Sequence, residues 1–175
     1  VATALRARDP AMRVVAPHKN PARTSLIREL LAQHGADFVE VHDGPLAPWL
    51  ATARLVLAKS GTGSLEACLH QVPTIVVYQL RGVLATLGYH NILSVPWIAA
   101  ANLIAGARVV PEHCFHGEHG WTRVLADAER LWTDAAARAR MVADLAAVRT
   151  RLGAPGATGR VAALVRRFLF AEAAR

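Results

Sequence analysis

The residues best suited to chemistry form a run of small residues that separates two apolar segments. This run, called the glycine turn below, comprises Ser60, Gly61, Thr62, Gly63 and Ser64, and Glu66 follows it closely. The apolar residues 55–58 predict a strand before the turn, and the residues after it predict a helix. A helix that begins this way leaves N–H groups unpaired, and small residues let an anion approach them. We therefore predict a phosphate-binding turn, with the Glu66 carboxylate placed to accept from a sugar hydroxyl.

Other polar residues are predicted at the same edge of the molecule. In open α/β sheets, ligands bind at the carboxyl ends of the strands. The Pro17-His18-Lys19 loop and the residues after Tyr78 follow predicted strands, so we expect them to share one crevice with the glycine turn. Lys59 is either a phosphate contact or a solvated strand end, and Tyr78 either lines the crevice or packs in the core.

A second group of side chains has the residue types of a metal site. Its members are His113, Cys114, His116 and His119. Their spacing suits no single helix face, and flanking glycines predict a surface loop. Structural zinc sites use a tighter Cys/His set, so we predict no metal and no cofactor here.

Alternating strands and helices are expected to position these residues. We predict strands at residues 12–16, 38–41, 55–58 and 72–78, and helices at residues 2–8, 22–34, 121–132, 134–151 and 158–173, with a short helical connection at residues 45–53. This alternation predicts an α/β fold, a Rossmann-like parallel sheet with helices on both faces. The 175 residues contain no long linker, so we expect a single domain, with a sheet core in residues 1–120 and helices in residues 121–175.

Charge and hydropathy narrow the possible partners. Twenty Lys and Arg residues against 13 Asp and Glu residues give a net charge of +7, which favours anionic partners. The arginines are dispersed and not interleaved with aromatic residues, so we predict no nucleic-acid partner. The longest apolar region, residues 82–107, is interrupted by polar residues and is not expected to span a membrane. The two cysteines show no pairing pattern, which indicates a reducing compartment.

Three motifs, in order, resemble those of the lipid-A-disaccharide synthases. They are the glycine turn with Leu-Glu at residues 60–66, Asn-Leu-Ile-Ala-Gly at residues 102–106, and Pro-Gly-Ala at residues 155–157. Members of that family are glycosyltransferases with two facing Rossmann-like domains, the GT-B architecture. The resemblance covers nearly the whole chain and places it in the C-terminal, donor-binding half.

The resemblance implies a reaction and a site. It implies transfer of a diacylglucosamine unit from UDP-2,3-diacylglucosamine to a lipid monosaccharide, lipid X, in lipid A biosynthesis. The enzyme would be peripheral to the cytoplasmic face of a Gram-negative inner membrane. By analogy the glycine turn would cradle the diphosphate through N–H and hydroxyl groups, Glu66 would hold the ribose hydroxyls, and Asn102 would contact the donor. No metal is needed in this scheme, because the helix terminus and basic side chains balance the departing UDP.

The chain also departs from the family pattern. The family's Gly-Ser-Arg loop and its acceptor half, which carries the proposed catalytic base, are absent from these residues. We therefore expect a fragment of a longer protein, with no catalytic residue of its own and no turnover alone. Ala100-Ala101 stand where family members often have Leu-Pro before the asparagine.

Several alternatives stay open from the sequence. The chain could belong to another UDP-sugar enzyme on the same fold, a 2-epimerase or an N-acetylglucosaminyltransferase, or be a non-catalytic nucleotide-binding module. Asn102 could instead satisfy a local turn, as asparagine often does. The apolar side of the last helix could pack back on the missing half of the enzyme, lie on acidic lipid or support a homodimer, and packing is the plainest expectation.

Overall fold

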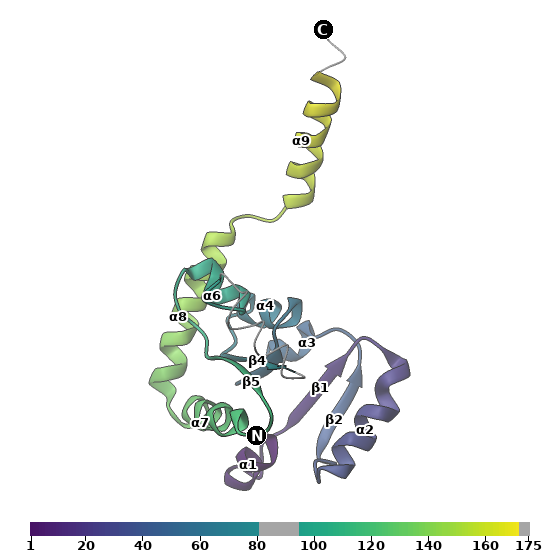
Figure 1. The fold of residues 1–175 in the computed structure, drawn as a ribbon, viewed down its shortest axis with the longest axis vertical. Coiled ribbons are helices and arrows are strands. Elements are labelled where there is room, and N and C mark those ends of the chain that lie inside the picture. Colours follow the sequence, from purple (N-terminus) through teal and green to yellow (C-terminus); the bar gives the residue numbers. More distant parts are fainter. Residues whose placement is uncertain (81–94, 172–175) are drawn as a thin grey trace.

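The computed structural model describes residues 1–80 and 95–171, in which an alternating α/β part is followed by a helical part (Figure 1). The strands are β1 (Val14–His18), β2 (Val39–Asp43), β3 (Val56–Lys59), β4 (Thr74–Leu80) and β5 (Glu112–His116). The helices are α1 (Ala2–Arg8), the 3-10 helix η1 (Pro21–Arg23), α2 (Thr24–Gln33), α3 (Ala47–Leu50), α4 (Thr62–Leu69), α6 (Ala100–Ala105), α7 (Gly120–Thr133), α8 (Ala135–Leu152) and α9 (Ala157–Ala171).

Every strand pair is parallel, which confirms the expected α/β class. Among the described residues, the strands form two sheets rather than the one expected: β1 pairs with β2, and β4 lies between β3 and β5. Helices α4 and α7 both pack on the three-stranded sheet. The parallel arrangement places the end of β3 and the end of β4 at the same edge, because Lys59 lies opposite Val77.

The main core lies between the three-stranded sheet and the two long helices α7 and α8. Ile75 in the central strand β4 is fully buried, as are Leu131 in α7 and Leu145 in α8. The buried residues of helix α8 recur at helical spacing and are Ala137, Met141, Leu145 and Val148. It starts where expected because the Asp134 side chain accepts a 2.9 Å hydrogen bond from the Ala137 N–H, which also lowers the pKa of Asp134.

Two helices leave large apolar side chains exposed. Helix α2 buries none of its residues, and Leu26 and Leu30 are among its exposed side chains. Helix α9 extends away from the body (Figure 1), and its side chains at residues 161, 164, 165, 168 and 169 are 48–71% exposed. The last helix is expected to pack on the half of the enzyme that these residues do not contain, so its exposure in this chain leaves that expectation a prediction. The expected end of this helix at residue 173 lies outside the described residues.

The strand β5 was not predicted from the sequence. Its residues alternate in burial, with His113 and Phe115 buried and His116 exposed. This alternation is typical of a half-buried strand, but histidines and a cysteine hide it in the sequence. The surface loop expected for residues 113–116 is therefore wrong.

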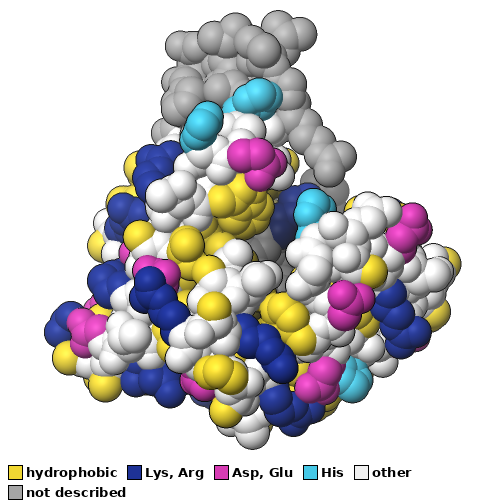
Figure 2. Space-filling model, turned by 90° about the horizontal axis from the view of Figure 1, so that it is seen from below, with side chains coloured by type: hydrophobic (Ala, Val, Ile, Leu, Met, Phe, Trp, Pro, Cys, Tyr) yellow, Lys and Arg dark blue, Asp and Glu magenta, His cyan; other side chains and the backbone are white. Residues whose placement is uncertain are grey.

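No helix within residues 1–80 and 95–171 is long and apolar enough to cross a membrane. Residues 82–94 of the apolar region lie outside the described part of the chain. On the face seen in Figure 2, basic side chains are interspersed with apolar and acidic ones rather than gathered in one patch.

Leu131→Ala is expected to lower the free energy of unfolding by about 2–5 kcal/mol, because it leaves a cavity in the packed core. Leu26→Ala is the matched control, since it removes the same atoms from a side chain that is 51% exposed. The control should change stability by less than about 0.5 kcal/mol. Urea denaturation measures both values, and equal losses would contradict the assignment of the core.

Glu40→Gln is expected to change how stability depends on pH. Arg13 donates two hydrogen bonds to Glu40, at 2.9 and 2.7 Å, and chiefly this contact lowers the pKa of Glu40 to about 2. A carboxyl with a lowered pKa stabilises the folded state above its ordinary pKa of 4.5, and this contribution is lost as the pH falls towards 2.

The variant should therefore lose less stability than the wild type between pH 4.5 and 2. The difference should be small, because exposed pairs are screened by solvent. Denaturation series across this range measure it, with Glu118→Gln as control. An equally steep decline in the Glu40 variant would show that the pair does not couple to folding.

Candidate functional site

The glycine turn connects β3, which ends at Lys59, to α4, whose first residue is Thr62. The Ser60 N–H donates to the Val77 carbonyl at 3.2 Å, so the turn leaves the sheet directly at its carboxyl edge. Gly61 has φ +151°, which residues with side chains rarely adopt. A Cβ added there would meet no atom within 4 Å. Glycine is therefore required by the backbone conformation and not by lack of space.

Two hydroxyl groups of the turn are engaged by the chain itself. Ser64 is 2% exposed, donates to the Gly61 carbonyl at 2.7 Å and accepts from the Gly61 N–H at 3.3 Å. The Ser60 hydroxyl donates to the Ile98 carbonyl at 2.9 Å. Because a phosphate oxygen needs a donor, neither hydroxyl proton is available to it in this arrangement. These two serines shape the turn.

The remaining groups of the turn are open. The N–H groups of Thr62 and Gly63 lie in the first turn of α4, where an amide has no acceptor within its own helix. Thr62 is exposed, and its hydroxyl has no partner among the described residues. The Lys59 ammonium lies at the end of β3, 5.4 Å from the centre of the Tyr78 ring. This combination of N–H groups, a hydroxyl and a cation can bind an anion.

Glu66 lies one helical turn beyond Thr62, in α4. Residues four apart share a helix face, so the carboxylate stands on the side of the helix that carries the Thr62 hydroxyl. Its side chain is half-buried and makes no hydrogen bond or ion pair within the described chain. An available carboxylate beside an anion site suits a ligand that has both phosphate and hydroxyl groups.

Tyr78 and His18 were expected to share a crevice with the glycine turn, and the structure shows the surroundings of each. Tyr78 is 36% exposed, so it is not a core residue. His18 ends β1, its Nε2 lies 3.2 Å from the Thr24 hydroxyl, and its buried Nδ1 has no partner in the described chain. No hydrogen bond or ion pair among the described residues joins this histidine to the glycine turn. A shared crevice therefore stays a prediction.

Asn102 is fully buried and saturated by hydrogen bonds. Its amide nitrogen donates to the Val110 carbonyl at 3.0 Å and to Glu112 at 3.1 Å. Its amide oxygen accepts from the N–H groups of Val109 and Val110 at 2.8 and 2.9 Å. The Asn102 side chain therefore has no hydrogen-bonding group left for a ligand. These contacts favour a role in the turn between α6 and β5 over direct contact with a sugar donor.

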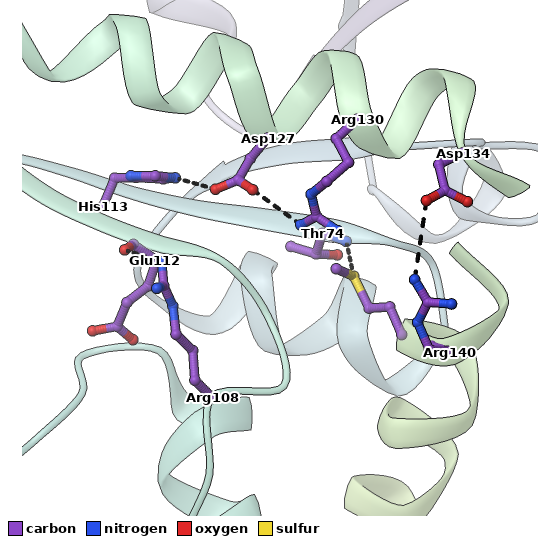
Figure 3. A network of polar contacts seen from close by, with 9 residues as sticks. Thr74, Arg108, Glu112, His113, Asp127, Arg130, Asp134 and Arg140 are labelled. Atoms are coloured by element: carbon purple, nitrogen blue, oxygen red, sulfur yellow. Dashed lines mark hydrogen bonds and ion pairs between the residues drawn. The ribbon is translucent and has the colours of Figure 1, made fainter. Parts of the chain in front are cut away.

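Glu112 is a residue that the sequence did not single out. Its carboxylate accepts from the N–H groups of Ile98 and Ala99 at 2.9 and 2.8 Å, in addition to Asn102. Figure 3 shows it beside Arg108, whose guanidinium donates to the Glu112 carbonyl at 3.4 Å. A carboxylate ten residues after the asparagine carries no periodic signal, so only the folded structure identifies it.

Three of the four residues with metal-ligand side chains, His113, Cys114 and His116, lie in β5, where His113 is buried and His116 is exposed. His113 points from β5 to Asp127 on α7, with 3.0 Å between Nε2 and Oδ2, and Asp127 also accepts from Arg130 at 3.0 Å (Figure 3). Within the described residues, no group of three or more His, Cys, Asp and Glu could hold a metal ion. A hollow of about 620 Å³ beside this network has Trp97, Arg108 and Arg123 in its wall but none of residues 60–66.

Comparison with models of known protein families shows which family this chain belongs to. A family model described as Lipid-A-disaccharide synthetase matches residues 1–143, which include the glycine turn and Asn102. The chain belongs to the lipid-A-disaccharide synthetase family. Two of the three motifs that resemble this family, at residues 60–66 and 102–106, fall inside the matched residues, and the third, at residues 155–157, lies beyond them.

Individual members of the lipid-A-disaccharide synthetase family are similar over much of the chain. The lipid-A-disaccharide synthase of Anaeromyxobacter dehalogenans (strain 2CP-1) is 35% identical over 158 residues, which cover 90% of this chain and 41% of the relative. That of Geobacter sulfurreducens is 30% identical over 161 residues, covering 92% and 41%. That of Myxococcus xanthus is 41% identical over 103 residues, covering 59% and 26%. The chain thus spans about two fifths of the length of the first two relatives.

Asn102→Ala is expected to destabilise the domain by about 1–3 kcal/mol, because it leaves the buried Val110 N–H without its acceptor. Asn20→Ala is the matched control, since that side chain is exposed and makes no hydrogen bond to the helix that it precedes. Thermal denaturation without any ligand measures both variants. Equal melting temperatures for Asn102→Ala and the wild type would contradict a role in the turn.

Proposed function

We propose that this chain is the nucleotide-sugar-binding domain of a lipid-A-disaccharide synthase and that its glycine turn binds the diphosphate of UDP. The observation that carries the proposal is the combination of open N–H groups at Thr62 and Gly63 with the Glu66 carboxylate on the same helix. The N–H groups are the donors that a diphosphate needs. The domain would comprise residues 1–175.

Glu66 would read the ribose of the nucleotide. A carboxylate can accept from both hydroxyls of a vicinal diol, as acidic residues do in other dinucleotide-binding sites. The side chain is half-buried and has no partner in the described chain, so a ribose would not have to displace an existing contact. Lys59 and the terminus of α4 would offset the negative charge of the diphosphate without a metal ion.

The domain would act within a longer enzyme. There it would hold UDP-2,3-diacylglucosamine while a hydroxyl of lipid X attacks the anomeric carbon, with inversion, and UDP departs. The catalytic base would lie outside these residues, and Asn102 would act on the donor indirectly, through the segments that it ties together. The enzyme would work at the cytoplasmic face of the inner membrane. Family membership and the names of the relatives support this proposal.

The wild-type chain is expected to bind UDP in a calorimetric titration and to bind UMP more weakly, because UMP lacks one phosphate. Glu66→Ala should weaken UDP binding about tenfold, because a charge-assisted hydrogen bond to the ribose is lost. Glu118→Ala removes an exposed carboxylate that lies outside the site and is the control.

Two outcomes would contradict the proposal. One is the absence of heat with a folded wild-type domain, and the other is equal UDP binding after Glu66→Ala. An assay of a full-length relative carrying this domain, with acylated and unacylated UDP-glucosamine, then separates the proposed reaction from that of another UDP-sugar enzyme. Turnover of the unacylated donor alone would favour the second.

A further inference from the structure

Glu112 attaches a neighbouring segment to the sheet. Its main chain lies in β5, in register with Val76 of the buried strand β4. Its Oε1 accepts from Ile98, and its Oε2 accepts from Ala99 and the Asn102 amide. Hydrogen bonds to an ionised carboxylate are stronger than those between neutral groups. One carboxylate therefore ties Ile98, Ala99 and Asn102 to β5.

The Glu112 bonds reach the residues just before α6. Ala99 directly precedes this helix and has no side-chain oxygen of its own. Glu112 accepts from the N–H group of Ala99 and from that of Ile98 before it. A carboxylate of β5 therefore holds the main chain that leads into α6.

The same segment contacts the glycine turn. Ile98 donates its N–H to Glu112 and accepts the Ser60 hydroxyl at its carbonyl, at 2.9 Å in both cases. Ser60 is the residue immediately before Gly61, whose unusual conformation redirects the chain into α4. A displacement of Ile98 would therefore move the acceptor that anchors the turn.

We propose that Glu112 is a positioning residue for the glycine turn. It fixes Ile98, Ile98 anchors Ser60, and Ser60 sets the direction in which the open N–H groups of Thr62 and Gly63 point. This inference rests on the proposed function of the turn and extends it to a side chain that touches no ligand. It predicts that loss of the carboxylate impairs diphosphate binding selectively, whereas a purely structural role would only lower stability.

Hydrogen exchange tests the connection without any ligand. The amides of Ser60, Gly61 and Leu65 are bonded to the Val77 carbonyl, the Ser64 hydroxyl and the Gly61 carbonyl. Glu112→Gln is expected to speed their exchange about tenfold while exchange in β2 stays unchanged, since local openings are independent. Glu118→Gln, which removes the same charge from an exposed side chain, should leave all of them unchanged.

Unchanged exchange in the turn of Glu112→Gln would overturn the proposal. If that variant does not fold, Ser60→Ala tests the same connection from the other end. It must speed exchange at Gly61 and Leu65, and failure to do so would also overturn the proposal.

Ligand binding gives the second test. Glu112→Gln should weaken UDP binding about tenfold and leave uridine binding unchanged, because only UDP contacts the turn. The double variant with Ser60→Ala should bind UDP no more weakly than the weaker single variant, as expected for residues that act through one path. Multiplied losses, or equal losses for UDP and uridine, would contradict the proposal. If the wild type does not bind UDP, the proposed function fails, and the exchange result still decides the role of Glu112.

Discussion

Burial of β4 on both faces confines the polar chemistry of this domain to the ends of its strands. Residues 74–77 are buried, and their main-chain groups pair with β3 and β5. An unpaired polar side chain in such a strand would lose its hydration without compensation. Only after Val77 does the strand become exposed, at Tyr78 and Gln79. Groups that meet a ligand must therefore come from this edge, and the glycine turn leaves the neighbouring strand there.

Most polar side chains in and around the glycine turn and the start of β5 serve to bond main-chain groups. Ser60, Ser64, Asn102 and Glu112 all bond N–H or carbonyl groups of the chain. Turns that leave a buried sheet have N–H and carbonyl groups without ladder partners, and these side chains supply the partners. What is left for a ligand is a smaller set, the first amides of α4 with Thr62 and Glu66. Polar residues of a family motif can therefore be needed for the shape of the main chain, and not only for contact with a substrate.

The sequence predicts best where one local pattern dominates. Helices α7 and α8 were placed within about two residues, because apolar residues recur at helical spacing and Asp134 caps the second helix. The strand β5 was missed, because only pairing with β4 makes a strand of residues with low β propensity. The sequence could not assign Asn102 to the turn either, since the four bonds that saturate it depend on how α6 and β5 meet.

The exposure of α9 has a consequence for any spectroscopic study of this chain. An isolated helix of 15 residues is marginal in water, and this one buries none of its described side chains. All four tryptophans lie elsewhere, at residues 49, 97, 121 and 132, so fluorescence reports the body of the molecule while circular dichroism also includes α9. The helical signal should therefore decline before the fluorescence signal on heating. Unfolding will not be two-state, and a single melting temperature will describe the body without its last helix.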